Sequence, residues 1–267
     1  MGRPRGPGRP RRGNSPRRQI VSQKNQQYTS GPVAELDVGV LLLDNHLPRP
    51  RGDVGNARTF EFPVAYAVIP GADTVRVVEQ SARGLLENAC AAANALVELG
   101  ARAVTTCCGF LAIFQQQLAD SLDVPVATSS LLQIPLVLQT LRSDQHVAVL
   151  TVNASTLTHQ HFARAGITDA QLARVTVVGL ENTAHFYPMI VGEIDYLDQD
   201  RAEREVVSAA TKALEDDPKI GAFVFECTNL PPYADAVRAA TSRPVWDATS
   251  LICWLQSGVQ RNRARKT

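Results

Sequence analysis

Short apolar runs alternate with longer helical stretches along most of the chain. The run at 37–43 is almost continuously apolar, which is typical of a parallel strand buried on both faces. The stretch at 74–99 predicts one long helix that ends at Gly100. Strands that alternate with helices in this way predict an α/β layer fold with parallel sheets.

The same order of elements occurs twice. Strands are expected at 37–43, 63–69, 103–107 and 124–127, and matching segments follow at 147–153, 174–180, 220–226 and 244–250. Asn153 follows Asp44 by 109 positions, and Cys227 follows Cys108 by 119. This duplication predicts two similar domains. Ligands of such folds bind beyond the carboxyl ends of the strands, where these four residues lie.

Two of the repeated segments, 103–114 and 222–232, carry candidate chemistry. Each is an apolar strand that ends on a cysteine and turns into a helix, whose free N–H groups and dipole stabilise a thiolate. Phe110, Phe114, Leu118 and Leu122 are spaced by four and predict one buried face of the helix after Cys108.

Two thiols that face each other across a cleft suit proton transfer at carbon. One thiolate removes a proton from one face and the other thiol returns one to the opposite face. The result is racemisation or epimerisation next to a carboxylate or carbonyl, with no metal or organic cofactor required. Each thiol then needs a pKa near the working pH. The sequence also allows buried structural thiols, since free cysteine is often buried.

The repeat distinguishes between the two adjacent cysteines. Cys108 aligns with Cys227, whereas Cys107 aligns with Glu226. Adjacent strand residues point to opposite faces, so we expect Cys108 and Cys227 to be the catalytic pair. The contribution of Cys107 stays open. We expect Cys90 and Cys253 to be core residues.

Polar residues at the strand ends are candidate substrate contacts. Hydroxyl groups and helix N–H groups at such positions can hold a carboxylate, although Ser, Thr and Asn also cap helices everywhere. Asp44 could accept a substrate ammonium or be a solvated turn carboxylate. The turn-rich loop at 52–60 is either a lid or an ordinary loop. The predicted substrate-binding set is Asp44, Asn45, Gly109, Thr128, Ser129, Asn153, Ser155, Thr228 and Asn229.

Histidine spacing does not favour a metal site. His159 and His161 are two positions apart and do not share a helical face, and no set of ligands with metal spacing accompanies them. We therefore expect no metal.

Charge is distributed unevenly. Residues 1–34 carry a net charge of +8 and residues 261–267 carry +4, so within a total of +1 the body at 35–260 carries −11. An acidic body argues against a nucleic-acid-binding domain. Residues 1–34 are rich in Arg, Pro and Gly, and we expect a disordered basic arm, either an electrostatic arm or a dispensable extension.

Cellular location follows from what the sequence contains. Five cysteines form no regular framework, which is typical of reduced intracellular thiols. We see neither an apolar signal segment nor an apolar run of the roughly 18 residues that a membrane span needs. We expect a cytoplasmic protein. The oligomeric state stays open, a homodimer included.

With these residues in view, the chain resembles the aspartate/glutamate/hydantoin racemase superfamily over about 35–260. The resemblance rests on the two strand-end cysteines, on Cys227-Thr228 and on the duplication. The segments Gly-Asp-Val-Gly-Asn, Thr-Thr-Cys-Cys-Gly-Phe and Glu-Cys-Thr-Asn resemble a little-characterised branch, the aspartate/glutamate racemase family proteins.

The resemblance implies two pseudo-symmetric Rossmann-like domains with the active site in the interdomain cleft. It places 35–135 and 251–267 in the first domain and 136–250 in the second. It implies a cofactor-independent isomerase of amino acids, hydantoins or related small acids, with Cys108 and Cys227 as the acid/base thiols and Thr228 on the substrate carboxylate.

Two positions depart from the better-known racemases. Gly109-Phe110 stands where they have Asn-Thr, and Asn229 stands where they have His or Glu. With these changes, a bulkier or less charged substrate, such as a 5-substituted hydantoin or another α-substituted acid, fits about as well as free aspartate or glutamate. Alternatives are an enzyme similar to the arylmalonate decarboxylases or maleate isomerases, a catalytically silent small-acid binding protein, and nucleic-acid binding through the basic arm.

Overall fold

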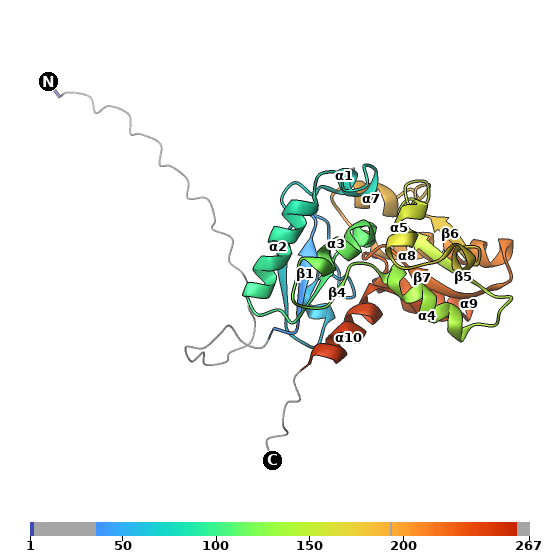
Figure 1. Ribbon diagram of the computed structural model, residues 1–267. Coiled ribbons are helices and arrows are strands. Elements are labelled where there is room, and N and C mark those ends of the chain that lie inside the picture. The colour runs from blue at the N-terminus through green and yellow to red at the C-terminus, as the bar shows by residue number, and fades with distance from the viewer. Residues whose placement is uncertain (3–35, 193, 261–267) are drawn as a thin grey trace, which may run out of the picture. The chain divides into compact units, whose positions relative to one another are not determined.

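A computed structural model describes residues 1–2, 36–192 and 194–260 (Figure 1). The predicted basic arm, beyond its first two residues, and the segment 261–267 lie outside the described residues. All the elements below belong to one compact unit.

The first half of the chain builds a four-stranded parallel sheet. Its strands stand in the order β2-β1-β3-β4, and Val38 pairs with Val64 on one side and with Ala103 on the other. The strands are β1 (Val38–Leu42), β2 (Val64–Val68), β3 (Ala103–Thr106) and β4 (Val126–Ala127).

The second half repeats this topology. Its sheet has the order β6-β5-β7-β8, again with every pair parallel. The strands are β5 (His146–Thr151), β6 (Val175–Gly179), β7 (Ile220–Phe225) and β8 (Val245–Trp246). Two parallel sheets with interleaved helices confirm the predicted fold class, and Figure 1 shows the first in blue to green and the second in yellow to orange.

Helices follow the strands in both halves. No helix in the described ranges is both long and apolar enough to cross a membrane. The helices are α1 (Thr74–Val78), α2 (Leu86–Glu98), α3 (Gln115–Asp120), α4 (Ile134–Thr140), α5 (His159–Arg164), α6 (Asp169–Leu172), α7 (Phe186–Val191), α8 (Gln199–Asp216), α9 (Ala234–Thr241) and α10 (Ala248–Val259), with 3₁₀ turns η1 (Ala57–Thr59), η2 (Gly109–Phe114), η3 (Ser130–Gln133) and η4 (Pro231–Tyr233).

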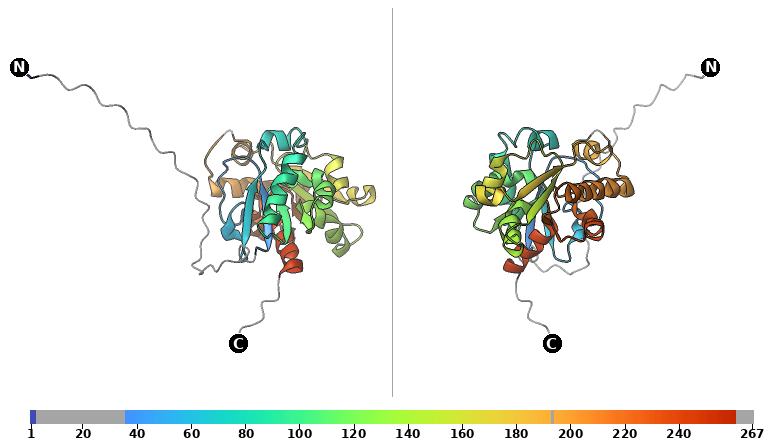
Figure 2. Two further views of the ribbon diagram at one scale, coloured as in Figure 1. Left: turned by 60° about the vertical axis from the view of Figure 1, so that its left-hand side comes forward. Right: turned by 90° about the vertical axis from the view of Figure 1, so that its right-hand side faces the viewer.

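Helix α10 returns to the first sheet after the last strand. Leu251 and Leu255 pack with Ala103 of β3 and Ala127 of β4, and all four are buried. Both views in Figure 2 show the red α10 beside the blue strands. The chain therefore crosses between the two halves twice.

Two predicted helices are wrong in detail. The single helix at 74–99 is instead α1 and α2, separated by a turn in which Ser81 and Ala82 have left-handed φ angles of 52° and 53°. Arg76 holds this turn through two bonds to the Arg83 carbonyl, at 3.1 and 3.0 Å. Gly84 lies in the same turn with a left-handed φ of 72°, and this glycine was the local signal of a break within the apolar periodicity. The helix after Cys108 likewise begins as the 3₁₀ turn η2, and α3 ends before Leu122.

Candidate active site

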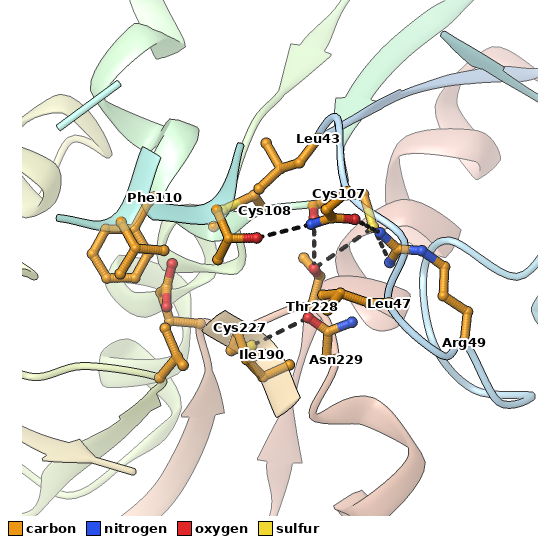
Figure 3. Close-up of a pocket in the computed structure, with 16 residues that line it drawn as sticks. Leu43, Leu47, Arg49, Cys107, Cys108, Phe110, Ile190, Cys227, Thr228 and Asn229 are labelled. Carbon is orange, nitrogen blue, oxygen red and sulfur yellow. Dashed lines mark hydrogen bonds between the residues drawn. The ribbon is translucent and has the colours of Figure 1, made fainter. Parts of the chain in front are cut away.

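A pocket lies where the carboxyl ends of β1 and β3 meet those of β5 and β7 (Figure 3). Its space, open mouth and solvent included, is about 350 Å³. Most of its wall is apolar. The lining residues are Leu43, Asn45, Leu47, Arg49, Thr74, Val78, Cys107, Cys108, Gly109, Phe110, Val152, Ile190, Glu226, Cys227, Thr228 and Asn229.

The two halves are tied together at this pocket. The Thr228 hydroxyl donates to the carbonyl of Cys107 at 2.9 Å, and the Ser130 hydroxyl donates to the carbonyl of Phe225 at 2.5 Å. All four residues are buried. These bonds hold the end of β3 against the end of β7, so the two cysteine-bearing segments share one site.

Three thiols line the pocket, from Cys107, Cys108 and Cys227. Strand alternation does not separate Cys107 from the other two thiols, because β3 ends at Thr106 and the alternation does not extend past the strand end. Cys108 precedes η2 in an extended conformation. Cys253 is exposed and not a core residue, and Cys90 is half-buried.

Burial dominates the acidity of these thiols. It raises the pKa of both Cys108 and Cys227 well above the usual value, and the nearby Glu226 raises each further. N–H groups of Phe110 and Leu111 lower the pKa of Cys108, as a helix start should, but burial outweighs them. The free site therefore holds thiols rather than thiolates at neutral pH.

Arg49 is a site residue that the sequence analysis missed. Its Nη1 donates to Asp53 Oδ1 and to Cys107 Sγ, both at 3.1 Å, and its Nη2 donates to Asn45 Oδ1 at 3.1 Å. A guanidinium has five N–H groups, so two have no acceptor among the described residues. Gly55 makes room for the side chain, since a Cβ there would lie 2.6 Å from Arg49 Nε.

Asp53 connects Arg49 to the second catalytic candidate. The side-chain amide of Asn229 donates to Asp53 Oδ2 at 2.5 Å. The Cys227 thiol donates in turn to Asn229 Oδ1 at 3.7 Å. Asp53 also accepts from the Gly55 amide at 2.7 Å and is only 1% exposed. The loop at 52–60 thus contributes a buried carboxylate that orients Asn229, which in turn orients the thiol.

Glu226 is the second residue that the sequence analysis missed as a site group. In the repeat it is the counterpart of Cys107. Its position directly after a fully apolar strand was the signal that could have marked it as a site residue. Its side chain is 0% exposed, and Oε2 accepts from the Thr151 hydroxyl at 2.7 Å. Burial raises the pKa of Glu226 to about 8.

The predicted site residues fall into two groups. Those that line the pocket are Cys108, Cys227, Asn45, Gly109, Thr228 and Asn229, and those that do not are Asp44, Thr128, Ser129, Asn153 and Ser155. The second group makes local bonds or faces solvent.

Capping and side-chain bonds explain the second group. Thr128 donates twice to Gln115 Oε1, and the Ser129 hydroxyl accepts from the Leu131 amide. Asn153 accepts from both the amide and the hydroxyl of Ser155. Asp44 is exposed. Across the described ranges, no three His, Cys, Asp or Glu side chains come together as a metal site.

Solved structures share this architecture. Unliganded arylmalonate decarboxylase superposes with a TM-score of 0.53 and 16% identity, covering 86% of this chain and 94% of that one. Glutamate racemase of Bacillus anthracis gives 0.51 and 13% identity over 84% and 82%, and Picrophilus torridus aspartate racemase gives 0.51 and 12% over 84% and 94%. The chain has the two-domain α/β fold of these enzymes.

Sequence similarity is more specific. The dimethylsulfoniopropionate lyase of Durusdinium sp. clade D is 32% identical over 221 residues, covering 81% of this chain and 72% of that protein. Dimethylsulfoniopropionate lyases 7 and 6 of Emiliania huxleyi (strain CCMP1516) are 32% and 33% identical. This chain spans 63% and 57% of their lengths. No family model matches the chain.

The chain belongs to the dimethylsulfoniopropionate lyase family. Its relatives in sequence and in fold are enzymes, and the Durusdinium and Emiliania relatives are lyases rather than isomerases.

Proposed function

We propose that the protein is a carbon-acid lyase. It removes the proton next to the carboxylate of a small β-sulfonium carboxylate, such as dimethylsulfoniopropionate, and expels the sulfide. One observation carries most weight: a guanidinium and three buried thiols, among them those of Cys108 and Cys227, line one small pocket in a chain of this family. The proposal retains the proton transfer at carbon that the two cysteines predict, and replaces racemisation with elimination.

Arg49 is the candidate anchor for the substrate carboxylate. It has two N–H groups without an acceptor among the described residues and lies at one end of the pocket in Figure 3. Guanidinium groups pair well with carboxylates. Thr228 is less suited to this role than the resemblance implied, because its single hydroxyl proton is already donated to Cys107.

A thiolate of Cys108 or Cys227 then acts as the base. It takes the proton from the α-carbon, and the electron pair of that C–H bond forms the α–β double bond. The bond from the β-carbon to sulfur breaks, and its electron pair leaves with the neutral sulfide. From dimethylsulfoniopropionate the products are acrylate, dimethyl sulfide and the protonated thiol, so atoms and charge balance.

The cationic substrate helps to form this base. Burial holds the pKa of each thiol above its usual value, because a buried thiolate has no favourable counter-charge. A sulfonium group beside the thiols supplies that counter-charge and lowers their pKa when it binds. We expect the thiolate to form in the complex rather than in the free enzyme.

Racemisation or epimerisation is the second candidate function. One specific observation favours it: Cys108 and Cys227 occupy equivalent ends of the repeat, and both line the pocket. A second thiol that protonates the opposite face of the carbanion would complete a racemase. In the lyase reaction, the sulfide leaves before the second thiol can protonate the α-carbon.

The test measures dimethyl sulfide in the headspace by gas chromatography, with dimethylsulfoniopropionate as substrate. We expect release by the full chain and a loss of at least 100-fold in Cys108→Ser or Cys227→Ser, since a positioned base contributes about 10²–10⁴-fold. Cys253→Ser is the matched control because that thiol is exposed. Absence of sulfide release, together with exchange of the α-proton of chiral acids in deuterated water, would favour the racemase instead.

A further inference from the structure

Glu226 has no part in the steps above, yet it lines the same pocket. Its Oε2 accepts from the Thr151 hydroxyl at 2.7 Å, whereas Oε1 has no hydrogen-bond partner among the described residues. Buried polar atoms are almost always paired. A fully buried carboxyl oxygen without a partner in the wall of a pocket indicates that a bound group completes its interactions.

Gly109 packs directly beside that oxygen. A Cβ at this position would overlap both Oε1 and the carbonyl oxygen of Glu226. The glycine therefore allows the start of η2 to pass directly beside the carboxyl group.

The neighbourhood of Glu226 suits a methylated cation. Phe110, the residue after Gly109, also lines the pocket, and Val152 and Ile190 add apolar surface. Aromatic faces and apolar walls accommodate onium groups, whose charge is spread over methyl groups. A carboxylate within such a wall attracts the positive charge of the onium group, while the apolar surface contacts its methyl groups.

The two ends of the pocket hold ionisable groups of opposite kind, the Arg49 guanidinium and the Glu226 carboxyl group, which lies beside Gly109. Figure 3 shows Arg49 at one end and Phe110 at the other, with Cys108 and Cys227 between them. A β-onium carboxylate has the same order along its chain: carboxylate, α-carbon, β-carbon, cation. In an α-amino acid the cation sits on the α-carbon itself, so its two charges are not separated in this way.

We propose that Glu226, with Phe110, forms the subsite for the cationic group of the substrate and selects zwitterions whose onium group is on the β-carbon. This assignment rests on the proposed function for the identity of the carboxylate end. Glu226 is then a specificity-determining residue, and the base remains one of the two thiols.

Cation binding at this subsite has a second consequence. The titratable groups that face the site are Glu226, Cys107, Cys108 and Cys227, beside the Arg49–Asp53 ion pair. Among the four acids Glu226 has the lowest pKa, about 8, because burial raises all of them and the thiols start higher. A cation bound at pH 7 should therefore displace close to one proton from Glu226.

The experiment compares two ligands of nearly identical shape by isothermal titration calorimetry of the full chain. The first, 3-(trimethylammonio)propionate, carries the cation. The second, 4,4-dimethylpentanoate, replaces nitrogen by carbon and is neutral at that end. We expect at least tenfold tighter binding of the cation, since hydrogen bonds and contacts to charged groups are the stronger kind. Titration in buffers of different ionisation enthalpy should show proton release with the cation alone.

Glu226→Gln keeps the shape of the side chain and should abolish both the preference and the proton release. Glu203→Gln, an exposed position on α8, is the matched control and should change neither. Equal binding of the two ligands by the wild type, binding of neither, or a preference retained in Glu226→Gln would overturn the subsite. Release of dimethyl sulfide by the wild type would still support the lyase in those cases, so the two proposals fail separately.

Discussion

Replacement of Arg49 separates its role in the fold from its role in binding. The side chain is 16% exposed and forms an ion pair with Asp53 at 3.1 Å, and Asp53 is 1% exposed. Arg49→Met removes the charge, whereas Arg49→Lys keeps the charge and loses the planar fork. The two variants therefore test different properties of one residue.

Their expected effects differ in kind. Arg49→Met leaves the Asp53 carboxylate buried without its cation, and breaking such a pair lowers the free energy of unfolding by about 3–5 kcal/mol. Arg49→Lys retains a cation and should lower it by about 1 kcal/mol. A lysine does not reproduce the paired geometry of a guanidinium, so one charge-assisted bond to the substrate is lost. Such a bond contributes about 1.5–3 kcal/mol, which is roughly 10–150-fold in kcat/KM.

Urea unfolding measures the first effect, and initial rates of dimethyl sulfide release measure the second. Arg201→Lys is the control, because the Arg201 side chain is 42% exposed and pairs with Glu205 within α8, away from the pocket residues. We expect Arg49→Lys to be nearly as stable as the wild type and at least roughly tenfold weaker in kcat/KM, mainly through KM. An Arg49→Lys enzyme with wild-type kinetics would refute the role of Arg49 as the anchor of the substrate carboxylate. Its ion pair with Asp53 would then be a structural contact alone.

Two further predictions concern Glu226 and its neighbour. Burial raises the pKa of Glu226 to about 8, so the folded state favours the neutral acid, and its stability contribution is complete at low pH and lost as pH rises. Urea unfolding of the wild type and of Glu226→Gln at several pH values measures this loss. Relative to the variant, the free energy of unfolding of the wild type should fall by roughly 1.4 kcal/mol per pH unit between about pH 5 and 8. A difference in free energy that does not change with pH would contradict the burial argument. Gly109→Ala should lower the free energy of unfolding by about 1–3 kcal/mol and reduce turnover, because the new Cβ overlaps Glu226. Gly258→Ala is the control: its Cβ meets open space, so the free energy of unfolding should change by no more than about 0.5 kcal/mol. Equal melting curves for the two variants would contradict the close approach of Gly109 to Glu226.

The repeat made the strands and the two cysteines accessible to sequence reasoning. A strand such as β7 is a continuous apolar run, and buried parallel strands produce that run wherever they occur. Cys108 and Cys227 follow such runs at matching positions, so the sequence predicted that they lie at the carboxyl ends of two sheets. The structure brings both into one pocket.

Arg49 and Asp53 show why the rest of the site could not be read from the chain. Both lie in a turn-rich loop whose composition is that of ordinary solvated loops, and nothing local marks either as buried. Their burial comes from the second half, because the Val54 amide reaches the Thr228 carbonyl at 3.5 Å and Asn229 donates to Asp53. Asn153 shows the reverse, since a strand-end amide that looked suited to a ligand caps its own turn instead.

By itself, the sequence determined the duplicated α/β fold and the placement of two thiols at strand ends, because both depend on periodicity within short segments. Only the tertiary structure decided which other groups surround those thiols. Whether a charged side chain is solvated, paired or left facing a pocket depends on what the other half of the molecule brings beside it. Asp53 is paired with Asn229 and Glu226 lies beside Gly109, and in both cases the neighbour comes from the other half of the chain.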